Sequence, residues 1–569
     1  MSKKIIIVGG VAGGATAAAR LRRLDENSHI VIFERGEHIS FANCGLPYYV
    51  GGVIKEKNDL LVQTVEGLSK RYNLDIRIKT EVLSIDRQNK TVLAKNLVTG
   101  AVYREDYDYL ILSPGASPIV PPIEGVKDNP KVFTLRTVGD AEDIVNYIRL
   151  NKARRAVVVG GGFIGLETAE NLKERNLEVI LVEATDQVLP ALDYEMACLL
   201  HAHLRQKGVK LILGDSVTGL DGSKVFLQSG RTVTADLVVM AIGVRPESFL
   251  AKEAGLALGY KNTIQVNEYL QTSDEAIYAI GDAIEVKHYI SGKPVHIPLA
   301  GPANRQGRMV ADNIYGRLKA YQGTLGTSVA KVFDLTVAST GLNEKTLKSA
   351  QIDYRVIHIH PNSHAGYYPG ATALTMKMLF TPEDKILGAQ AVGHKGVEKR
   401  IDVLATAIRG NLTVYDLQDL ELAYAPPYSS GKDPVNFLGY VAANVLDGLV
   451  ETVQYHEIDD LVRAGNILID VRQPEEYKYG RIAGSVNIPL SELRNRLETL
   501  PKDKPIYVCC LSGLRSYIAT RILKGHGFRA INLDGGYRTY ASVYADRQIV
   551  NEDYEISVDE SGETVIEKK

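Results

Sequence analysis

Two of the chain's four cysteines stand where a short segment passes into a helix, a position that suits reactive thiols. Cys44 lies in SFANCGLPYYV (40–50), directly before an expected helix. Cys510 ends an apolar strand and opens the loop CLSGLR (510–515), which leads into another expected helix. Backbone N–H groups at a helix amino terminus stabilise a thiolate and lower its pKa. We therefore expect Cys44 and Cys510 to be nucleophiles, and Arg515 to stabilise the Cys510 anion.

The cysteine count limits what Cys44 can do. No second cysteine lies near it, and the spacing CxxC of zinc and thioredoxin-type sites is missing from the sequence, so we expect neither a metal site nor a disulfide framework. A single thiol cannot store two electrons as an internal disulfide. Its oxidised form must be a mixed disulfide with a small thiol, a persulfide or a sulfenic acid. We interpret Cys198 and Cys509 as buried structural residues.

Two glycine-rich turns predict the elements that position this chemistry. An apolar strand near the N-terminus is followed by GGVAGG (9–14) and an alanine-rich helix. Gly9 permits the tight turn and Gly14 the close approach of helix to strand, although Val11 replaces the usual middle glycine. A second strand ends in Glu34, about 20 residues further on, where a carboxylate can bind an adenosine ribose. This pattern predicts a Rossmann unit.

The pattern returns in AVVVGGGFIGLETAENL (156–172). Gly160, Gly162 and Gly165 complete GxGxxG, and the next strand ends in Glu183. Two dinucleotides are therefore expected. An acidic residue at this strand end repels a 2′-phosphate, which favours NADH over NADPH at the second site.

Three further segments follow in a fixed order: LSPGASP (112–118), AIGVRPE (241–247) and YAIGDAIE (278–285). With both glycine loops they make residues 1–445 resemble the two-dinucleotide flavoprotein disulfide reductase superfamily. The resemblance implies that Asp282 holds the FAD ribitol and that PLAGPANRQGR (298–308) lies against the flavin. The residues expected to bind FAD are Gly9, Gly14, Glu34, Arg35, Asn43, Gly115, Asp282, Pro298 and Ala300, and those expected to bind NAD are Gly160, Gly162, Gly165, Glu183 and Gly243.

Dithiol members of the superfamily carry CxxxxC beside the flavin, whereas Tyr49 stands here in place of the second cysteine. Two single-cysteine subgroups remain. The NADH oxidases and peroxidases, which use a sulfenic acid, carry histidine in the first glycine loop, where this chain has Ala12. The segments SFANC and YAPPYSSGKDPVNFLGYVAANV (424–445) resemble the coenzyme A disulfide reductases instead.

The resemblance to the coenzyme A disulfide reductases implies a proton donor and a substrate that contains coenzyme A. Tyr424, supplied by the partner subunit of a homodimer, would protonate the coenzyme A thiolate, and either Tyr367 or Tyr368 in YYPG (367–370) would assist. Coenzyme A carries a phosphorylated ADP that attracts cations. The residues expected to bind it are Ser40, Asn43, Arg20, Arg22, Arg23, Lys70 and Arg71, although a solvated helix face explains the first three arginines equally well.

The strand and helix pattern restarts after residues 447–455. ILIDVR (467–472), GSVNIP (484–489) and LDGGY (533–537) surround the Cys510 loop in an order that resembles rhodanese domains over about 455–545. The six residues from Cys510 to Arg515 match the loop length of sulfurtransferases, since related phosphatases use a longer loop. This resemblance implies that Cys510 carries a persulfide.

The 569 residues, with 66 basic and 68 acidic side chains, indicate a multidomain enzyme without a field of one sign, so neither nucleic acid nor membrane is expected as a partner. The first expected strand begins only a few residues from the N-terminus, and no run of apolar residues is long enough for a signal peptide or a membrane span. We therefore expect a cytoplasmic protein. We expect an α/β fold with two Rossmann-like domains, an α+β dimerisation domain and an α/β rhodanese domain. The predicted parts are an FAD domain (1–119 and 241–324), an NAD domain (120–240), a dimerisation domain (325–446), a linker (447–455), a rhodanese domain (456–545) and a tail (546–569).

The sequence thus predicts an FAD-dependent, NADH-consuming reductase of coenzyme A disulfide, coenzyme A persulfide or polysulfide, with a rhodanese domain that handles sulfane sulfur. Two alternatives stay open. One is an NADH oxidase or peroxidase that uses a Cys44 sulfenic acid, and the other is a sulfurtransferase or redox sensor. The sequence does not select among coenzyme A disulfide, coenzyme A persulfide, polysulfide and glutathione persulfide.

Overall fold

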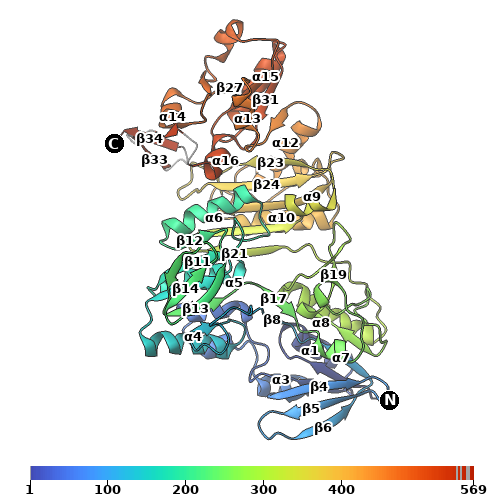
Figure 1. Ribbon diagram of the computed structural model, residues 1–569. Coiled ribbons are helices and arrows are strands. Elements are labelled where there is room, and N and C mark those ends of the chain that lie inside the picture. The colour runs from blue at the N-terminus through green and yellow to red at the C-terminus, as the bar shows by residue number, and fades with distance from the viewer. Residues whose placement is uncertain (1, 546–548, 551–553, 559–563, 569) are drawn as a thin grey trace. The chain divides into compact units, whose positions relative to one another are not determined.

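The computed structural model describes residues 2–545, 549–550, 554–558 and 564–568 (Figure 1). The chain divides into two units, one made of residues 1–188 and 208–326 and the other of 189–207 and 327–569. Each unit is described by itself below. The predicted tail 546–569 lies partly outside the described residues.

A parallel sheet begins the first unit, because KIIIV and HIVIF bury nearly every side chain and so need cover on both faces. Helices α1 (Ala12–Leu24) and α8 (Ala300–Ile314) pack against each other beside it. The strand order is β18-β7-β1-β2-β3, with β1 (Lys4–Val8), β2 (His29–Phe33), β3 (Asp75–Arg77), β7 (Tyr109–Leu112) and β18 (Ile277–Ala279).

A second parallel sheet in the same unit repeats this plan. Its central strand β10 (Arg155–Val159) leads through a glycine turn into α5 (Phe163–Glu174). The order is β12-β11-β10-β16-β9, with β9 (Val132–Phe133), β11 (Glu178–Glu183), β12 (Lys210–Leu213) and β16 (Leu237–Met240).

Smaller elements complete the first unit. The other helices are α2 (Leu46–Gly51), α3 (Val65–Tyr72), α4 (Val138–Asn151) and α7 (Phe249–Glu253), with the short 3-10 turns η1 (Asn43–Gly45), η2 (Lys57–Leu60), η3 (Tyr260–Asn262) and η4 (Gly281–Ala283). Antiparallel sheets are formed by β4 (Thr80–Asp86), β5 (Thr91–Asn96) and β6 (Val102–Asp106), by β13 (Val217–Asp221), β14 (Lys224–Leu227) and β15 (Thr232–Thr234), by β8 (Ala116–Pro118) with β17 (Val244–Pro246), and by β19 (Val286–Lys287) with β20 (Pro294–Val295).

The second unit contains an antiparallel sheet whose strand β25 (Ile386–Gly393) is buried along its whole length. The order is β21-β22-β25-β24-β23, with β21 (Ser328–Val332), β22 (Leu335–Gly341), β24 (Leu374–Phe380) and β23 (Arg355–Ile359). Its helices are α6 (Tyr194–Gln206), α9 (Glu344–Ala350), α10 (Val397–Arg409), α11 (Asp416–Asp419) and α12 (Pro434–Leu446).

A parallel sheet at the C-terminal end of the second unit has a separate core on each face. Alternate residues of β30 (Ile506–Cys509) face opposite cores, Val508 one and Tyr507 the other. The order is β26-β31-β30-β27-β29, with β26 (Glu451–Val453), β27 (Ile467–Asp470), β29 (Val486–Asn487) and β31 (Ala530–Leu533). The remaining elements are α13 (Ile458–Arg463), α14 (Pro474–Tyr479), η5 (Leu493–Thr499), α15 (Leu514–Gly525), α16 (Gly536–Val543), and the pairs β28 (Gly480–Arg481) with β32 (Ile549–Val550) and β33 (Tyr554–Val558) with β34 (Thr564–Lys568).

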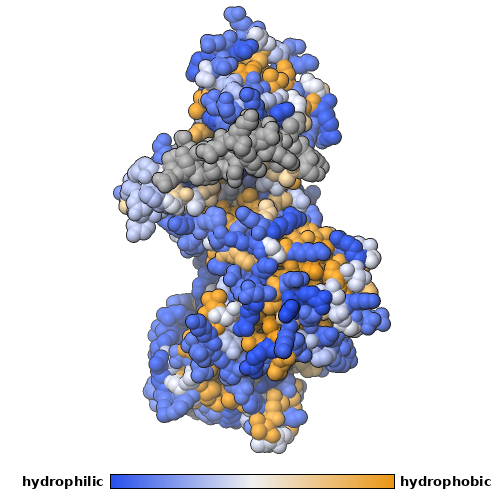
Figure 2. Space-filling model, turned by 90° about the vertical axis from the view of Figure 1, so that its left-hand side faces the viewer, coloured by the Kyte–Doolittle hydropathy of each residue, from blue (hydrophilic) through white to orange (hydrophobic). Residues whose placement is uncertain are grey.

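The predicted fold class is confirmed: two parallel α/β sheets, an antiparallel sheet with helices, and a C-terminal parallel sheet. The domain limits stay predictions, and helix α6, which falls within the predicted NAD domain, groups with the second unit. Within the described residues no helix is long and apolar enough to cross a membrane. Figure 2 shows one face of the molecule, where hydrophilic residues are mixed with separate hydrophobic areas.

Candidate functional site

Cys44 lies on η1, directly before α2, and its side chain is exposed. The loop is fixed because the N–H of Ala42 donates to the carbonyl of Leu60, 2.8 Å away. None of the four cysteines, all of which belong to the described part of the chain, forms a disulfide. Cys44 is therefore an accessible thiol whose oxidation partner must come from outside the chain.

The charges near Cys44 oppose ionisation. Partial burial is the largest cause that raises its pKa, and the carboxylates of Glu167 and Asp282 raise it further. The prediction that a helix amino terminus lowers this pKa is therefore wrong. Helix α2 has only six residues, and its dipole is outweighed by lost hydration and two negative charges.

Glu167 was not singled out from the sequence, although it stands in the GGFIGLE segment beside the predicted glycine loop. Burial raises its pKa to about 7, and the hydroxyl of Tyr48 donates to it over 3.4 Å. A carboxyl group that titrates near neutral pH can hold or release a proton beside Cys44. The signal that could have found it is an acidic residue on the first turns of a mainly apolar helix.

The first glycine loop has the geometry of a nucleotide site. Gly9 adopts φ +98°, and a Cβ there would lie 2.1 Å from the Ser113 carbonyl oxygen, while a Cβ on Gly14 would lie 1.9 Å from that of Gly9. Glu34 accepts the N–H groups of Gly10 and Gly36 at 2.8 and 2.7 Å, which holds its carboxylate at the strand end. The amino terminus of α1 has no side-chain cap, so its N–H groups are open to a pyrophosphate.

The second glycine loop has the same geometry, in which Gly160 forms the tight turn, Gly165 permits the close approach of helix to strand, and Gly162 leaves space for the ligand. Gly160 has φ +106°, and a Cβ on Gly165 would lie 1.9 Å from the Gly160 carbonyl oxygen. A Cβ on Gly162 would meet nothing within 4 Å, so this glycine leaves open space at the uncapped start of α5. Glu183 accepts the N–H groups of Gly161 and Thr185 at 2.7 and 2.8 Å.

Asp282 lies on η4, where strand β18 ends, and burial raises the pKa of its carboxyl group. Among the described residues none donates a hydrogen bond to this carboxylate, while its main-chain carbonyl lies 2.7 Å from the Nε2 atom of His296. An unpartnered carboxylate at the end of a parallel strand fits the hydroxyl groups of a ribityl chain. The other residues expected near FAD are Arg35, which pairs with Glu81 at 3.6 Å, Gly115 at φ +75°, and Pro298 and Ala300 at the start of α8.

Several cations expected to bind coenzyme A have partners within the chain. Arg20 pairs with the buried Asp312 at 2.6 Å. Arg22 is 5% exposed, and its guanidinium donates to four main-chain carbonyls, those of Tyr72, Asp25, Glu26 and Asn73. This leaves Arg22 little capacity to bind a phosphate, so we assign it a structural role.

The other expected ligands of coenzyme A lie on exposed helix ends or near Cys44. Arg23 stacks on the ring of Tyr72, and Lys70 forms an exposed pair with Glu66. Arg71, at the end of α3, is exposed as well. Ser40 has the unusual φ of +46°, and Asn43 begins η1.

The tyrosines of the second unit form a pair. The hydroxyl oxygens of Tyr367 and Tyr424 lie 2.7 Å apart, and both side chains are exposed. This hydrogen bond raises the pKa of Tyr367, so its hydroxyl remains protonated at neutral pH. Tyr368 instead stacks edge-on against His364. The structure therefore brings Tyr367, rather than Tyr368, next to Tyr424.

Cys510 sits in the loop between β30 and α15 and is 1% exposed. Its Sγ atom accepts the N–H of Gly513 at 3.1 Å and the hydroxyl of Ser516 at 3.3 Å. Donors of this kind stabilise a thiolate or persulfide anion. Ser516 was not predicted. Cys509 is fully buried in the core on the opposite face of the sheet, as its expected structural role requires.

Arg515 has a partner that the sequence did not indicate. Its two terminal nitrogens donate to the carboxylate of Glu476 at 2.7 and 2.6 Å, a bidentate pair. Glu476 fixes the guanidinium and offsets part of its charge beside the Cys510 loop. Arg515 is thus oriented by α14.

Comparisons with known proteins agree with this arrangement. Residues 3–307 match the family model of pyridine nucleotide-disulphide oxidoreductases, 327–433 match the dimerisation domain of that family, and 454–542 match the rhodanese-like domain. The coenzyme A disulfide reductase of Staphylococcus epidermidis is 37% identical over 442 residues, which cover 77% of this chain and 99% of that protein.

Two solved structures resemble the whole chain. Reduced CoADR-RHD of Bacillus anthracis has 58% identity and a TM-score of 0.95, over 96% of this chain and 99% of that one. An NAD-dependent persulfide reductase from A. fulgidus has 40% identity and a TM-score of 0.88, over 95% and 100%. The family implies FAD and NAD(P)H as cofactors. The chain therefore belongs to the pyridine nucleotide-disulphide oxidoreductases, as an enzyme with the family's dimerisation domain and a C-terminal rhodanese-like domain.

Proposed function

We propose that the protein is an FAD-dependent, NADH-consuming reductase of coenzyme A disulfide, coenzyme A persulfide or polysulfide, whose rhodanese domain handles sulfane sulfur. One observation carries this proposal: Cys44 is an accessible thiol without a cysteine partner, so the sulfur that it joins belongs to the substrate. Two relatives support the same substrate class by their names. One, which matches 77% of this chain, is a coenzyme A disulfide reductase, and the other, which matches 95% of it, is a persulfide reductase.

The chemistry at Cys44 follows from thiol–disulfide exchange. The Cys44 thiolate attacks one sulfur of the substrate's S–S bond and forms a mixed disulfide, while the other sulfur leaves as a thiolate or, from a persulfide, as hydrosulfide. Held by the two glycine loops and Asp282, FAD and NADH would supply the electron pair that, with one proton, converts the mixed disulfide to the Cys44 thiolate and a free thiol. One NADH and one proton thus convert a disulfide to two thiols.

Three side chains are the proposed proton donors to the leaving thiolates. Glu167, whose pKa is about 7, holds a proton close to Cys44. The hydroxyls of Tyr367 and Tyr424 form the second source, and we assign them to the partner subunit of a homodimer, in keeping with the match to the dimerisation domain. Their mutual hydrogen bond lets one hydroxyl support the other as it donates its proton.

Ligand selection rests on charge. The exposed cations Arg23, Lys70 and Arg71, with Ser40 and Asn43 near Cys44, are the proposed contacts of coenzyme A. At the nicotinamide nucleotide, the Glu183 carboxylate is held by two N–H groups, which supports NADH, since a 2′-phosphate beside it would be repelled.

At Cys510 the proposed step is sulfur transfer without net redox change. The Cys510 thiolate attacks the sulfane sulfur of a donor such as thiosulfate, whose S–S bond breaks to release sulfite. Cys510 then carries a persulfide, whose charge the N–H of Gly513 and the hydroxyl of Ser516 would stabilise. A coenzyme A thiolate then attacks the outer sulfur, which forms coenzyme A persulfide and restores the Cys510 thiolate. The released persulfide is a substrate of the kind that Cys44 reduces.

Anaerobic NADH oxidation tests the proposal, with coenzyme A disulfide and coenzyme A persulfide offered separately to the FAD-loaded wild type, Cys44→Ser and Cys510→Ser. We expect Cys44→Ser to abolish turnover and Cys510→Ser to retain it, with hydrosulfide released from the persulfide. No turnover on either substrate, together with rapid NADH oxidation once air is admitted, would instead identify Cys44 as a sulfenic-acid centre.

A further inference from the structure

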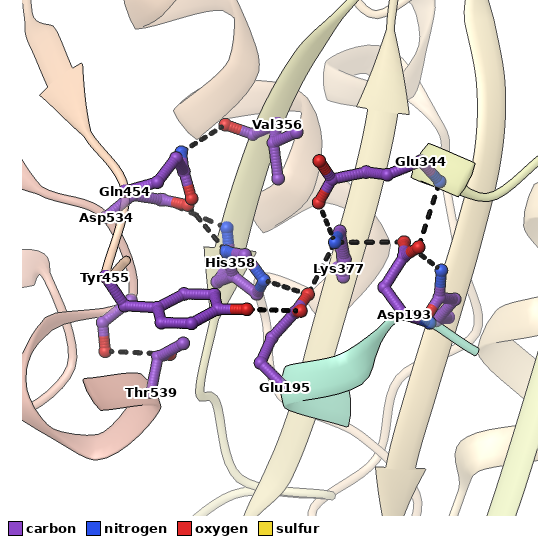
Figure 3. A network of polar contacts seen from close by, with 12 residues as sticks. Asp193, Glu195, Glu344, Val356, His358, Lys377, Gln454, Tyr455, Asp534 and Thr539 are labelled. Atoms are coloured by element: carbon purple, nitrogen blue, oxygen red, sulfur yellow. Dashed lines mark hydrogen bonds and ion pairs between the residues drawn. The ribbon is translucent and has the colours of Figure 1, made fainter. Parts of the chain in front are cut away.

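A network of charged side chains in the second unit connects helix α6 and the antiparallel sheet to Asp534 (Figure 3). The Lys377 ammonium lies among the carboxylates of Asp193, Glu195 and Glu344. Glu195 also contacts His358, which in turn contacts Asp534 of the C-terminal domain. Neither the reductase site nor the sulfur-transfer step described above uses this network, so its position calls for its own explanation.

His358 links the antiparallel sheet to the C-terminal domain, and both nitrogens of its ring contact a carboxylate. Its side chain, on β23, is 1% exposed, with Nδ1 2.6 Å from an Asp534 carboxylate oxygen and Nε2 3.1 Å from one of Glu195. Because both neighbours are acceptors, both ring nitrogens must carry a proton. Burial favours the neutral ring, but the two carboxylates outweigh it and raise the pKa of His358 to about 9. The main-chain N–H of His358 also donates to Asp534, over 3.1 Å.

Asp534 begins the turn that supports the Cys510 loop. Gly535 and Gly536 follow it with φ of +65° and +62°. A Cβ on Gly535 would lie 2.9 Å from the Cβ of His358, and one on Gly536 would lie 2.5 Å from the Cys510 carbonyl oxygen. The turn is therefore a single layer of backbone with His358 on one side and the Cys510 loop on the other.

The same turn is hydrogen-bonded to the loop. The N–H of Tyr537 donates to the Cys510 carbonyl at 2.7 Å, and the N–H of Arg538 donates to that of Leu511 at 2.9 Å. A displacement of Asp534 would therefore be passed to the backbone that carries Cys510. A second link, between His360 and Thr539 at 3.0 Å, holds the next turn of α16.

We propose that His358 is a positioning residue for sulfur transfer at Cys510: clamped between Glu195 and Asp534, it fixes the glycine turn on which the Cys510 loop rests. This inference rests on the proposed role of Cys510 in sulfur transfer. It assigns a function in the rhodanese reaction to a histidine that lies outside the rhodanese-like domain, whose match spans 454–542.

The two ring contacts can be separated with a matched pair of variants. The amide nitrogen of asparagine takes the place of Nδ1, so His358→Asn keeps a donor to Asp534 and loses the one to Glu195. The amide nitrogen of glutamine takes the place of Nε2, so His358→Gln does the reverse. The control is Tyr455→Phe, which removes the 3.1 Å hydrogen bond to Glu195 without touching Asp534.

Each full-length, FAD-loaded variant is assayed for transfer of sulfur from thiosulfate to a thiol, and for NADH oxidation at Cys44. We expect His358→Gln to lower kcat for sulfur transfer about tenfold or more, with the KM for thiosulfate little changed. The reason is that a misplaced Cys510 loop slows the transfer of sulfur but does not weaken the binding of thiosulfate. His358→Asn and Tyr455→Phe keep most of the transfer activity, and NADH oxidation is preserved in all three.

Equal losses in His358→Asn and His358→Gln would overturn the positioning role, since a general loss of stability affects both. Unchanged transfer in His358→Gln, or a parallel loss of its Cys44 turnover, would overturn it as well. Failure of the underlying proposal has a different signature, because wild type itself would then transfer no sulfur and Cys510→Ser would change nothing.

Discussion

Lys377→Met is the sharpest test of how the second unit is held together. The ammonium of Lys377 is 0% exposed and lies 2.9 Å from Asp193, with Glu195 and Glu344 also in contact. Methionine fills a similar volume but removes the charge, so the buried carboxylates of Asp193 and Glu195 and the partly buried one of Glu344 lose their common cation. Removal of one partner from a buried ion pair costs about 3–5 kcal/mol. At 1.36 kcal/mol for each factor of ten, this makes local opening about 100-fold more frequent or more.

Hydrogen exchange of peptides that cover β24 measures this opening without the assumption that a multidomain chain unfolds in one step. The control is Lys348→Met, because Lys348 pairs with the same Glu344 but is 64% exposed. An exposed pair contributes about 0–1 kcal/mol, so the control should exchange within about fivefold of wild type.

The stability difference between wild type and Lys377→Met should depend on pH, and the carboxyl pKa values give the direction of that dependence. In wild type, burial raises the pKa of Glu344 but the charge of Lys377 outweighs it, so that the pKa falls to about 2. Stability from this pair is present above the ordinary carboxyl range and is lost only as pH falls toward 2. Without Lys377, burial and mutual repulsion raise the carboxyl pKa values, so protonation stabilises the variant.

The difference in opening between Lys377→Met and wild type should therefore shrink from pH 7 to pH 5, after correction for the intrinsic pH dependence of exchange. The protonated ring of His358 stabilises both proteins, and this stabilisation is complete only below about pH 6.5, because the pKa of His358 is raised from that value on folding. His358 therefore changes the stability of both proteins in the same direction between pH 7 and pH 5. A difference that is the same at both pH values, or no faster exchange in the variant at all, would refute the reasoning.

Three further outcomes are expected at the reductase site. Glu167→Gln removes a carboxylate that raises the pKa of Cys44, so the pH profile of Cys44 alkylation should move to lower pH by up to about one unit; an unmoved profile contradicts this. Tyr424→Phe should lower kcat with coenzyme A disulfide about 100-fold, and an unchanged kcat would remove this tyrosine from the mechanism. Gly165→Ala should not fold, since its Cβ would lie 1.9 Å from a carbonyl oxygen, whereas Gly162→Ala should fold with a raised KM for NADH; equal yields of both proteins would show that the glycine roles are wrong.

The glycine loops and the cysteines could be predicted because each is a local pattern. Gly160 and Gly165 need only their own turn and the strand beside it, and the alternation of β30 alone turns Cys509 away from the Cys510 loop. The same locality explains the fold class, since buried runs such as KIIIV require a sheet covered on both faces.

Other features depend on contacts far apart in the sequence. Lys377 and Glu195 are separated by 182 residues, and His358 and Asp534 by 176, so no spacing rule points to either pair. The same limit explains Arg22, which has the appearance of a phosphate ligand on a basic helix face until its guanidinium is seen to bind main-chain carbonyls up to 51 residues away.

The two sulfur centres differ in what the chain provides around the sulfur. Cys510 is enclosed and receives an N–H donor from its own loop and an O–H donor from Ser516 on α15, so a negative charge on it, or on an attached sulfur, is stabilised by fixed dipoles. Cys44 is exposed and faces two carboxylates that raise its pKa. An environment that stabilises a sulfur anion suits a centre that stores sulfane sulfur. A raised pKa keeps more of the Cys44 thiol protonated, but it makes the thiolate, once formed, a stronger nucleophile towards the S–S bond of the substrate. The opposite electrostatics therefore argue for a division of labour, in which Cys510 carries sulfur and Cys44 discharges it.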